Sequence, residues 1–249
     1  MSEILFLAHR IPFPPDRGDK IRSWHVLKHL AGLGRVHLAC FADDAADAAH
    51  LRGLRQALGD RLGEVHVEVR RVGKPVAAAR ALAGGKPLSL TLFDSARMRR
   101  FVADRLADAR MSAVYAFSGQ MAQFVPDGLR QNFVMDFVDM DSAKFEAYAE
   151  AGGLLAPVHA REARRLSAYE RSVAARADDC LFVSEAEAAL FRDRTGADNV
   201  HALANGIDAR HFAPDAAFPR LGEAERGQGP ILLFTGQMDY RPNIDAVRW

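Results

Sequence analysis

The chain has 249 residues, of which 49% are hydrophobic and 26% carry charge. This composition suits a folded core and excludes disorder over most of the length. Its 33 Lys and Arg residues nearly balance its 32 Asp and Glu residues, whereas a dedicated nucleic-acid binder usually carries a basic excess. The first residues, MSEILF, do not resemble a signal peptide, and no apolar run approaches the roughly 20 residues of a membrane span.

The first elements follow from a short apolar run and a helical period. Residues 4–8 predict a strand, and residues 9–20 form a loop with three prolines. A helix is indicated by apolar residues at every third position: Ile21, Trp24, Leu27, Leu30 and Leu33. We expect Asp16 or Asp19 to cap this helix and Gly34 to end it.

Strands and helices continue to alternate. Further strands are predicted at residues 36–41, 65–69, 113–117, 133–138 and 180–184, and helices from 43, at 94–109, 158–177 and 185–194. Valines alternate with polar residues at 65–69, so this strand should be half exposed and near a sheet edge. The alternation predicts an α/β fold, with a parallel sheet flanked by helices on both faces.

The composition changes near residue 209. Residues 209–229 are rich in proline, glycine and charge, which is typical of a linker. Residues 231–236 predict a new buried strand, and a helix should begin near Asn243 or Ile244. We therefore expect a domain at 1–208, an interdomain linker at 209–229, and at 230–249 the start of a second domain that the chain's end truncates.

The first loop is the leading candidate site, because ligands of open parallel sheets bind at the carboxyl ends of strands. The predicted substrate-binding residues there are His9, Arg10, Asp16, Arg17, Gly18, Asp19 and Lys20. A long loop at this position favours binding over a solvated surface. At Gly18, backbone N–H groups could face an anion or a sugar hydroxyl without obstruction. The loop has neither a Walker nor a GxGxxG pattern.

A second candidate lies in residues 135–142, MDFVDMDS. Asp136 and Asp139 end a buried strand, where carboxylates can accept hydroxyl hydrogen bonds or a proton, and we predict that they are catalytic. Asp139 and Asp141 also spell D-x-D, which can hold a divalent metal. No further ligand is identifiable, so no metal site is expected. A helix cap or a surface position is the alternative.

Other features have structural explanations at least as strong. Arg161, Arg164 and Arg165 on the long helix could contact anionic lipid or phosphate, or form a solvated face. The two cysteines, Cys40 and Cys180, end apolar runs and are expected to be buried free thiols in a reducing cytoplasm.

Two stretches resemble family-4 GT-B glycosyltransferases. Residues 205–208, NGID, with Phe212 and Pro214 look like the interdomain signature, in which Asn-Gly favours a tight turn. Residues 233–243, LFTGQMDYRPN, are similar to the opening of the second domain. The first-loop stretch HRIPFPPDRGDKIR and MDFVD at 135–139 look closest to sugar transferases of exosortase/PEP-CTERM exopolysaccharide systems.

The resemblance implies two Rossmann-like domains that face each other across a cleft. The first domain holds a glycan or lipid-linked acceptor, with Ser118, Asn205 and Gly206 added to the substrate-binding residues. The second domain binds a nucleotide-sugar, and its donor-binding residues here are Gly236, Arg241 and Asn243. Transfer retains the anomeric configuration and needs no cofactor or metal. The protein would be cytoplasmic, with peripheral contact at the inner membrane surface.

Two departures from the family matter. The family often places a histidine near the transferred sugar, where this chain has Asp136 or Asp139. Its E-x7-E motif belongs to the second domain, so Glu162 and Glu170 on the long helix are interpreted as coincidental. Most donor-binding residues would lie beyond residue 249, so the fragment should be inactive alone. The alternatives are a non-catalytic binding module of the same fold, or another Rossmann-like enzyme such as a sugar-nucleotide epimerase, which the lack of GxGxxG disfavours.

Overall fold

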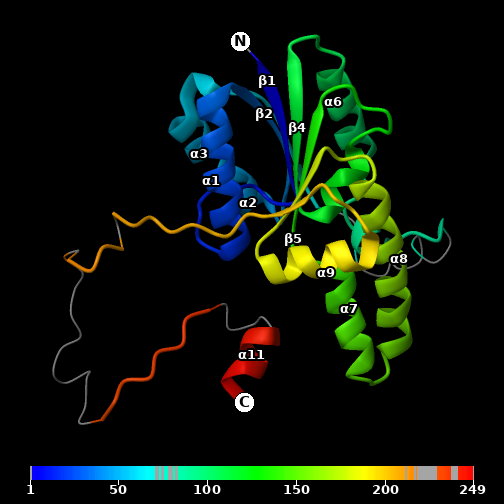
Figure 1. The fold of residues 1–249 in the computed structure, drawn as a ribbon. Helices are drawn as coiled ribbons and strands as arrows, with labels where there is room; N and C mark the ends of the chain where they lie inside the picture. Colours follow the sequence, from blue (N-terminus) through cyan, green and yellow to red (C-terminus); the bar gives the residue numbers. More distant parts are fainter. Residues whose placement is uncertain are drawn as a thin grey trace. The chain divides into compact units, whose positions relative to one another are not determined.

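The computed structural model describes residues 2–70, 73, 76–77, 81, 84–210, 212–215, 217, 229–236 and 241–248. The chain divides into two compact units, Met1–Asn205 and Gly206–Trp249. Figure 1 shows the ribbon of both.

The first unit is built on one parallel sheet. Its strands are β1 (Glu3–Ala8), β2 (Arg35–Ala42), β3 (Leu62–Val69), β4 (Met111–Phe117), β5 (Asn132–Val138), β6 (Asp179–Phe182) and β7 (Val200–Ala202). They lie in the order β3-β2-β1-β4-β5-β6-β7, and every neighbouring pair is parallel. The α/β prediction is therefore confirmed. The strand order reverses between β1 and β4, which makes that position the topological switch point.

The helices lie on both faces of the sheet. They are α1 (Gly18–Leu33), α2 (Ala45–Ala49), α3 (Leu51–Leu58), α5 (Leu88–Thr91), α6 (Ala96–Leu106), α7 (Asp141–Glu150), α8 (Ala156–Ala174) and α9 (Glu185–Thr195), with 3-10 turns η1 (Gly59–Arg61) and η2 (Gly119–Phe124). One core packs Trp24, Leu27 and Leu54 of α1 and α3 against β1 and β2. The other packs Val102 and Phe191 of α6 and α9 against the opposite face. Figure 1 shows α1 and α3 on one side and α6 and α8 on the other.

The strands behave as their sequences predict. All six residues of β1 are buried, as expected for a central strand covered on both faces. β3 lies at the sheet edge and its last residues are only half-buried, which confirms the prediction from its alternating valines. Cys40 and Cys180 are buried free thiols, also as predicted.

Helix α1 departs from the prediction in its cap and its buried face. Arg17 occupies the N-cap position without a side-chain hydrogen bond, so neither Asp16 nor Asp19 caps the helix. Ile21 and Leu33 are 39% and 65% exposed. Because a three-residue step covers only about 300° of a turn, a period of three drifts off the buried face. Gly34 ends the helix as predicted. The position requires glycine because a Cβ there would lie 2.5 Å from the Ser2 carbonyl oxygen.

The long predicted helix is present as α8, but α7 was not predicted. The two run side by side as a hairpin that extends past the carboxyl edge of the sheet (Figure 1). Gly152 and Gly153 lie in the connection between them and both have positive φ, 78° and 96°. Glycine adopts this conformation without a steric penalty, which allows the tight reversal.

The second unit contains α11 (Arg241–Arg248), which confirms the helix expected near Asn243. The strand predicted at residues 231–236 does not form, and Leu232 and Leu233 are 95% and 84% exposed. A strand needs a hydrogen-bonded neighbour, and none of the described residues pairs with this segment. Most of the predicted linker, residues 209–229, lies outside the described residues. The assignment of residues 230–249 to a second domain stays a prediction.

Candidate functional site

The candidate site lies at the switch point, where β1 and β4 end side by side. His9 follows β1, and Phe117 is the last residue of β4. The His9 ring stacks on Phe117 with centroids 5.8 Å apart, and it meets the edge of Phe93 at 6.2 Å. The first predicted site is therefore at the sheet edge where ligands of this fold class bind.

Asp19 gathers the basic residues of the first loop around one carboxylate. Its Oδ2 lies 2.7 Å from Arg10 Nη1 and 3.3 Å from His9 Nε2, and its Oδ1 lies 3.0 Å from Arg17 Nε. Burial alone would raise the pKa of Asp19, but hydrogen bonds from His9 and Arg10 outweigh it and hold the pKa well below its ordinary value. Arg10 also reaches Asp43 after β2, with Nε 3.2 Å from Oδ2. The group His9, Arg10, Arg17 and Asp19 is called the His9 cluster below.

One ring nitrogen of His9 in this cluster has no hydrogen bond. His9 Nδ1 is buried and has no hydrogen-bond partner among the residues that the structure describes. Leaving a buried polar atom unpaired costs about 1–3 kcal/mol, so such atoms are rare in folded proteins. Because Asp19 faces Nε2, that nitrogen carries the proton in the neutral ring, and Nδ1 is left as an acceptor.

The other first-loop residues divide between the surface and the interior. Asp16 and Gly18 are exposed. A Cβ at Gly18 would meet no atom within 4 Å, so internal packing does not require glycine there. Lys20 is buried, and its Nζ lies 2.7 Å from Asp47 Oδ1. Hydrogen bonding to Lys20 outweighs the effect of burial and lowers the pKa of Asp47. Lys20 therefore joins α1 to α2 rather than facing the site.

Asp136 lies beneath the sheet edge with its acceptor positions filled. The side chain is fully buried. Arg22 approaches it with two nitrogens, Nε 2.9 Å from Oδ2 and Nη2 3.1 Å from Oδ1. Tyr115 donates its hydroxyl to Oδ2 at 2.7 Å, and the Val138 amide donates to Oδ1 at 3.2 Å. These four bonds use the lone pairs of the carboxylate. They favour a positioning role, and the catalytic role predicted for Asp136 stays a prediction.

Arg22 also holds the segment that leaves the sheet after β7. Its Nη1 donates to the Leu203 carbonyl at 2.6 Å and to Asn205 Oδ1 at 3.1 Å. One buried guanidinium thus joins α1, β5 and the end of the first unit. Sequence reasoning missed this role, because an arginine early in a helix is typical of a surface position. The only available signal was its place in the first-loop stretch HRIPFPPDRGDKIR.

Backbone strain marks the ends of β4 and β5. Among the described residues, Ser118 and Val138 are the non-glycine positions with positive φ, 74° and 71°. For a β-branched residue this conformation is an outlier. The pairing of β5 with β6 shifts register between Asp136 and Val138, and the Val138 carbonyl accepts from the Val183 amide at 2.8 Å. Strain and bulges of this kind concentrate at functional sites.

The strained turn at Val138 brings Asp139 to the surface. Partial burial, followed by repulsion from the Glu187 carboxylate, raises the pKa of Asp139. Asp141 instead begins α7, where it pairs with Lys144 and accepts from Gln120 Nε2 at 3.2 Å. Within the described part of the chain, no three His, Cys, Asp or Glu side chains are placed to hold a metal ion.

Glu162 and Glu170 have a structural explanation. Glu162 accepts from the amides of Leu88 and Ser89 at 2.8 and 2.9 Å, at the start of α5. Glu170 accepts from the Ser142 amide at 3.0 Å and hydroxyl at 2.5 Å, at the start of α7. Each carboxylate satisfies N–H groups that a helix start leaves unpaired. Burial raises the pKa of Glu170 to about 7.

The predicted donor-binding residues belong to the second unit. A Cβ at Gly236 would lie 2.7 Å from Asn243 Nδ2, so these two residues are neighbours. The side chain of Arg241 lies outside the described residues. Gly206 is exposed, with space for a Cβ. The binding roles of all four residues stay predictions.

Comparisons with known proteins do not assign the chain to a family. No protein-family model matches the chain, and no curated protein matches its sequence. The crystal structure of LpCGTa in complex with UDP aligns with 83% of this chain and 55% of that chain, with 12% identity and a TM-score of 0.46. The chain thus spans about half the length of that protein. No helix in the described part of the chain is long and apolar enough to cross a membrane.

Proposed function

We propose that residues 1–208 form the acceptor-side domain of a retaining GT-B glycosyltransferase that resembles family 4. It would transfer a hexosyl group from a nucleotide-sugar to a glycan or lipid-linked acceptor in exopolysaccharide biosynthesis. The ordered motifs that resemble this family support the proposal. The Rossmann-type strand order supports it as well, because that order places the first loop at the switch point.

The observation that carries the proposal is the unpaired Nδ1 of His9. The imidazole is packed against Phe117 and oriented by Asp19, so its free acceptor has a fixed position. An acceptor nitrogen beside aromatic faces suits a sugar hydroxyl, which offers a hydrogen to donate and C–H surface to stack. A glycine-rich cofactor loop is not found at this position of the sequence.

We assign the other steps of sugar transfer to different residues. Asp139 reaches the edge beyond the strained turn, and its raised pKa suits the exchange of a proton with an acceptor hydroxyl. Backbone amides at Gly18 and the N-terminus of α1 would stabilise a leaving diphosphate. Gly236, Arg241 and Asn243 would bind the donor. A lipid-linked acceptor would bring the protein to the inner membrane surface.

A binding experiment tests the proposal on the full chain. Ligand-observed NMR would measure affinities for UDP-, GDP- and ADP-sugars, NAD, and a short-chain polyprenyl diphosphate monosaccharide as acceptor. We expect His9→Ala to weaken acceptor binding by about tenfold, which is the usual effect of one lost hydrogen bond. His25→Ala, at an exposed position of α1, is the matched control and should bind normally.

Two outcomes would overturn the proposal. If NAD binds and the sugar ligands do not, the chain is a different Rossmann-like enzyme. If His9→Ala binds the acceptor as the wild type does, the switch point is not the acceptor site. Because residues 1–249 are expected to be inactive alone, radiolabelled sugar transfer separates an enzyme from a binding module only in a chain extended through the proposed donor-side domain, where only the enzyme gives a labelled product.

A further inference from the structure

The distal part of the α7–α8 hairpin is uncovered. No residue from 143 to 161 is buried. Leu154, Leu155 and Val158 lie at the turn and are 100%, 61% and 50% exposed; these three residues are called the hairpin tip. Figure 1 shows the hairpin extending past the carboxyl edge of the sheet, and no described element of the first unit covers its end. Adjacent exposed apolar side chains on a projecting element indicate an interaction surface.

Aromatic contacts hold the two helices together behind the tip. Phe145 and Tyr148 of α7 lie with ring centroids 5.9 and 5.6 Å from that of His159 on α8. All three side chains are partly exposed. The hairpin therefore keeps its shape through ring contacts between its own helices, and the leucines at the turn are not needed for that packing.

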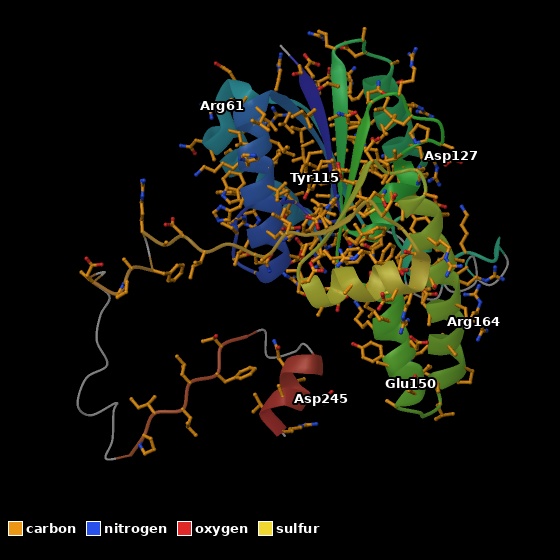
Figure 2. The ribbon with its side chains drawn as sticks, in the orientation of Figure 1. Arg61, Tyr115, Asp127, Glu150, Arg164 and Asp245 are labelled. Atoms are coloured by element: carbon orange, nitrogen blue, oxygen red, sulfur yellow. The ribbon has the colours of Figure 1, made fainter. Side chains whose placement is uncertain are left out.

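Three positively charged side chains lie behind the hairpin tip. Arg164 and Arg165 are exposed, and neither has an ion pair or hydrogen bond with any residue that the structure describes. Lys86 is also exposed. Its carbonyl accepts from Arg161 Nη2 of α8 at 3.3 Å, and a Cβ at the preceding Gly85 would lie 3.8 Å from Arg165 Nη2, so this segment runs beside the arginines. At about 1.5 Å per residue, Arg164 and Arg165 lie roughly 9–11 Å along α8 from Val158, and farther from Leu154 and Leu155. Figure 2 shows Arg164 farther from the turn than Glu150.

The nearby carboxylates do not cancel this charge. Glu146 is paired with Arg194, with Oε2 2.6 Å from Nη1, and Glu162 is buried under the helix. Glu150 remains as an exposed acid near the tip. The exposed cations Lys86, Arg164 and Arg165 therefore outnumber it, and the surface complements an anionic partner.

We propose that the hairpin tip inserts into the surface of an anionic lipid bilayer, with Lys86, Arg164 and Arg165 at the level of the phosphates. Interfacial apolar groups sit about 5–10 Å below the headgroup boundary, which is close to the spacing between Val158 and the arginines, and the two leucines lie deeper still. Basic side chains next to such groups add attraction to anionic lipid. Three apolar side chains form a smaller surface than a stable protein interface requires, so a bilayer fits better than a second copy of the chain. This inference rests on the hairpin and on Lys86 beside it, and it does not depend on the proposed transfer reaction.

Vesicle co-sedimentation of the full chain tests the inference. We expect binding to vesicles of phosphatidylglycerol with phosphatidylcholine, and at least about tenfold weaker binding to phosphatidylcholine alone. Leu154→Ser combined with Leu155→Ser should weaken binding to the anionic vesicles by about tenfold or more, because both side chains lose their apolar contact. Arg164→Glu combined with Arg165→Glu should weaken it similarly and reduce its salt dependence.

The matched control is Leu33→Ser, which removes an equally exposed leucine from the end of α1 and should leave binding unchanged. All of these positions are exposed, so circular dichroism and thermal melting should match the wild type. Equal vesicle binding by the double serine variant would overturn the inference. The inference would also be overturned if the wild type did not bind anionic vesicles but self-associated through the tip in size-exclusion chromatography. The surface would then join two copies of the chain.

Discussion

Two polar clusters at the sheet edge differ in how completely their hydrogen bonds are satisfied. Asp136 is buried, and Arg22, Tyr115 and the Val138 amide occupy its oxygens. The His9 cluster is partly exposed, and His9 Nδ1 has no partner among the described residues. A saturated buried network fixes geometry, whereas a network with a free position can accept a ligand. The difference assigns stability to the first cluster and recognition to the second.

Asp136→Ala should give the largest effect and tests the stabilising role directly. The variant leaves the Arg22 guanidinium and the Tyr115 hydroxyl buried without their partner. Removing one member of a buried ion pair costs about 3–5 kcal/mol. Urea unfolding at neutral pH measures the change in the free energy of unfolding. Arg22 also positions the segment at Leu203 and Asn205, so hydrogen exchange in that segment should accelerate.

The control for this variant is Asp136→Asn, which keeps the volume and an acceptor for Tyr115 while removing the charge. It should lose less stability than Asp136→Ala. A loss below about 1 kcal/mol for Asp136→Ala would contradict the comparison, because the cluster would then not hold the edge together. Asp136 could in that case be available for catalysis, as its sequence position first suggested.

Glu170 extends the comparison to a buried carboxylate held by Ser142 rather than by arginine. Its pKa is raised by burial from an ordinary value of 4.5 to about 7. The folded state therefore retains a proton that the unfolded state has lost between these values, and stability should fall as the pH rises from about 4.5 to 7. The difference corresponds to about 3 kcal/mol. Unfolding free energies measured between pH 5 and 8 should show this slope.

Two variants isolate Glu170 in that measurement. Glu170→Gln should remove most of the slope, because the amide does not titrate. Ser142→Ala removes a hydroxyl that lowers the pKa of Glu170, so it should move the decline to higher pH. An unchanged slope in Glu170→Gln would assign the pH dependence to other groups.

The sequence predicted the sheet well because doubly covered strands such as β1 need continuous apolar runs. It also predicted that the candidate loops lie together, since in a parallel sheet every loop after a strand lies at one edge. Helix α7 was missed because its residues 141–150 lack a buried face: only Ser142 is buried. Apolar periodicity reports burial, so a projecting hairpin gives no such signal.

The roles within the site were harder to predict than its place. Asp136 and Asp139 look equivalent in sequence, yet the positive φ at Val138 separates them into a buried and an exposed carboxylate. Arg22 was overlooked because its partner lies 114 residues away in the chain. Pairings of this kind depend on tertiary packing, which local propensity does not encode.

Asp19→Asn should give the smallest effect on stability and tests whether the His9 cluster is held by charge. Hydrogen bonds from His9 and Arg10 keep the pKa of Asp19 below its ordinary value of 3.8. A lowered pKa stabilises the fold above about pH 4, and this contribution is lost as the pH falls further. Because Asp19 is 23% exposed, solvent screening limits the effect to about 1 kcal/mol. Urea unfolding at pH 6 and pH 3 should therefore show a smaller difference in Asp19→Asn than in the wild type.

Asp16, exposed in the same loop, has no side-chain hydrogen bond among the described residues, so Asp16→Asn should change stability by less than about 0.5 kcal/mol. If both variants behave alike, the basic residues of the loop do not depend on Asp19. The orientation of His9, and with it the acceptor role of Nδ1, would then lack its physical support.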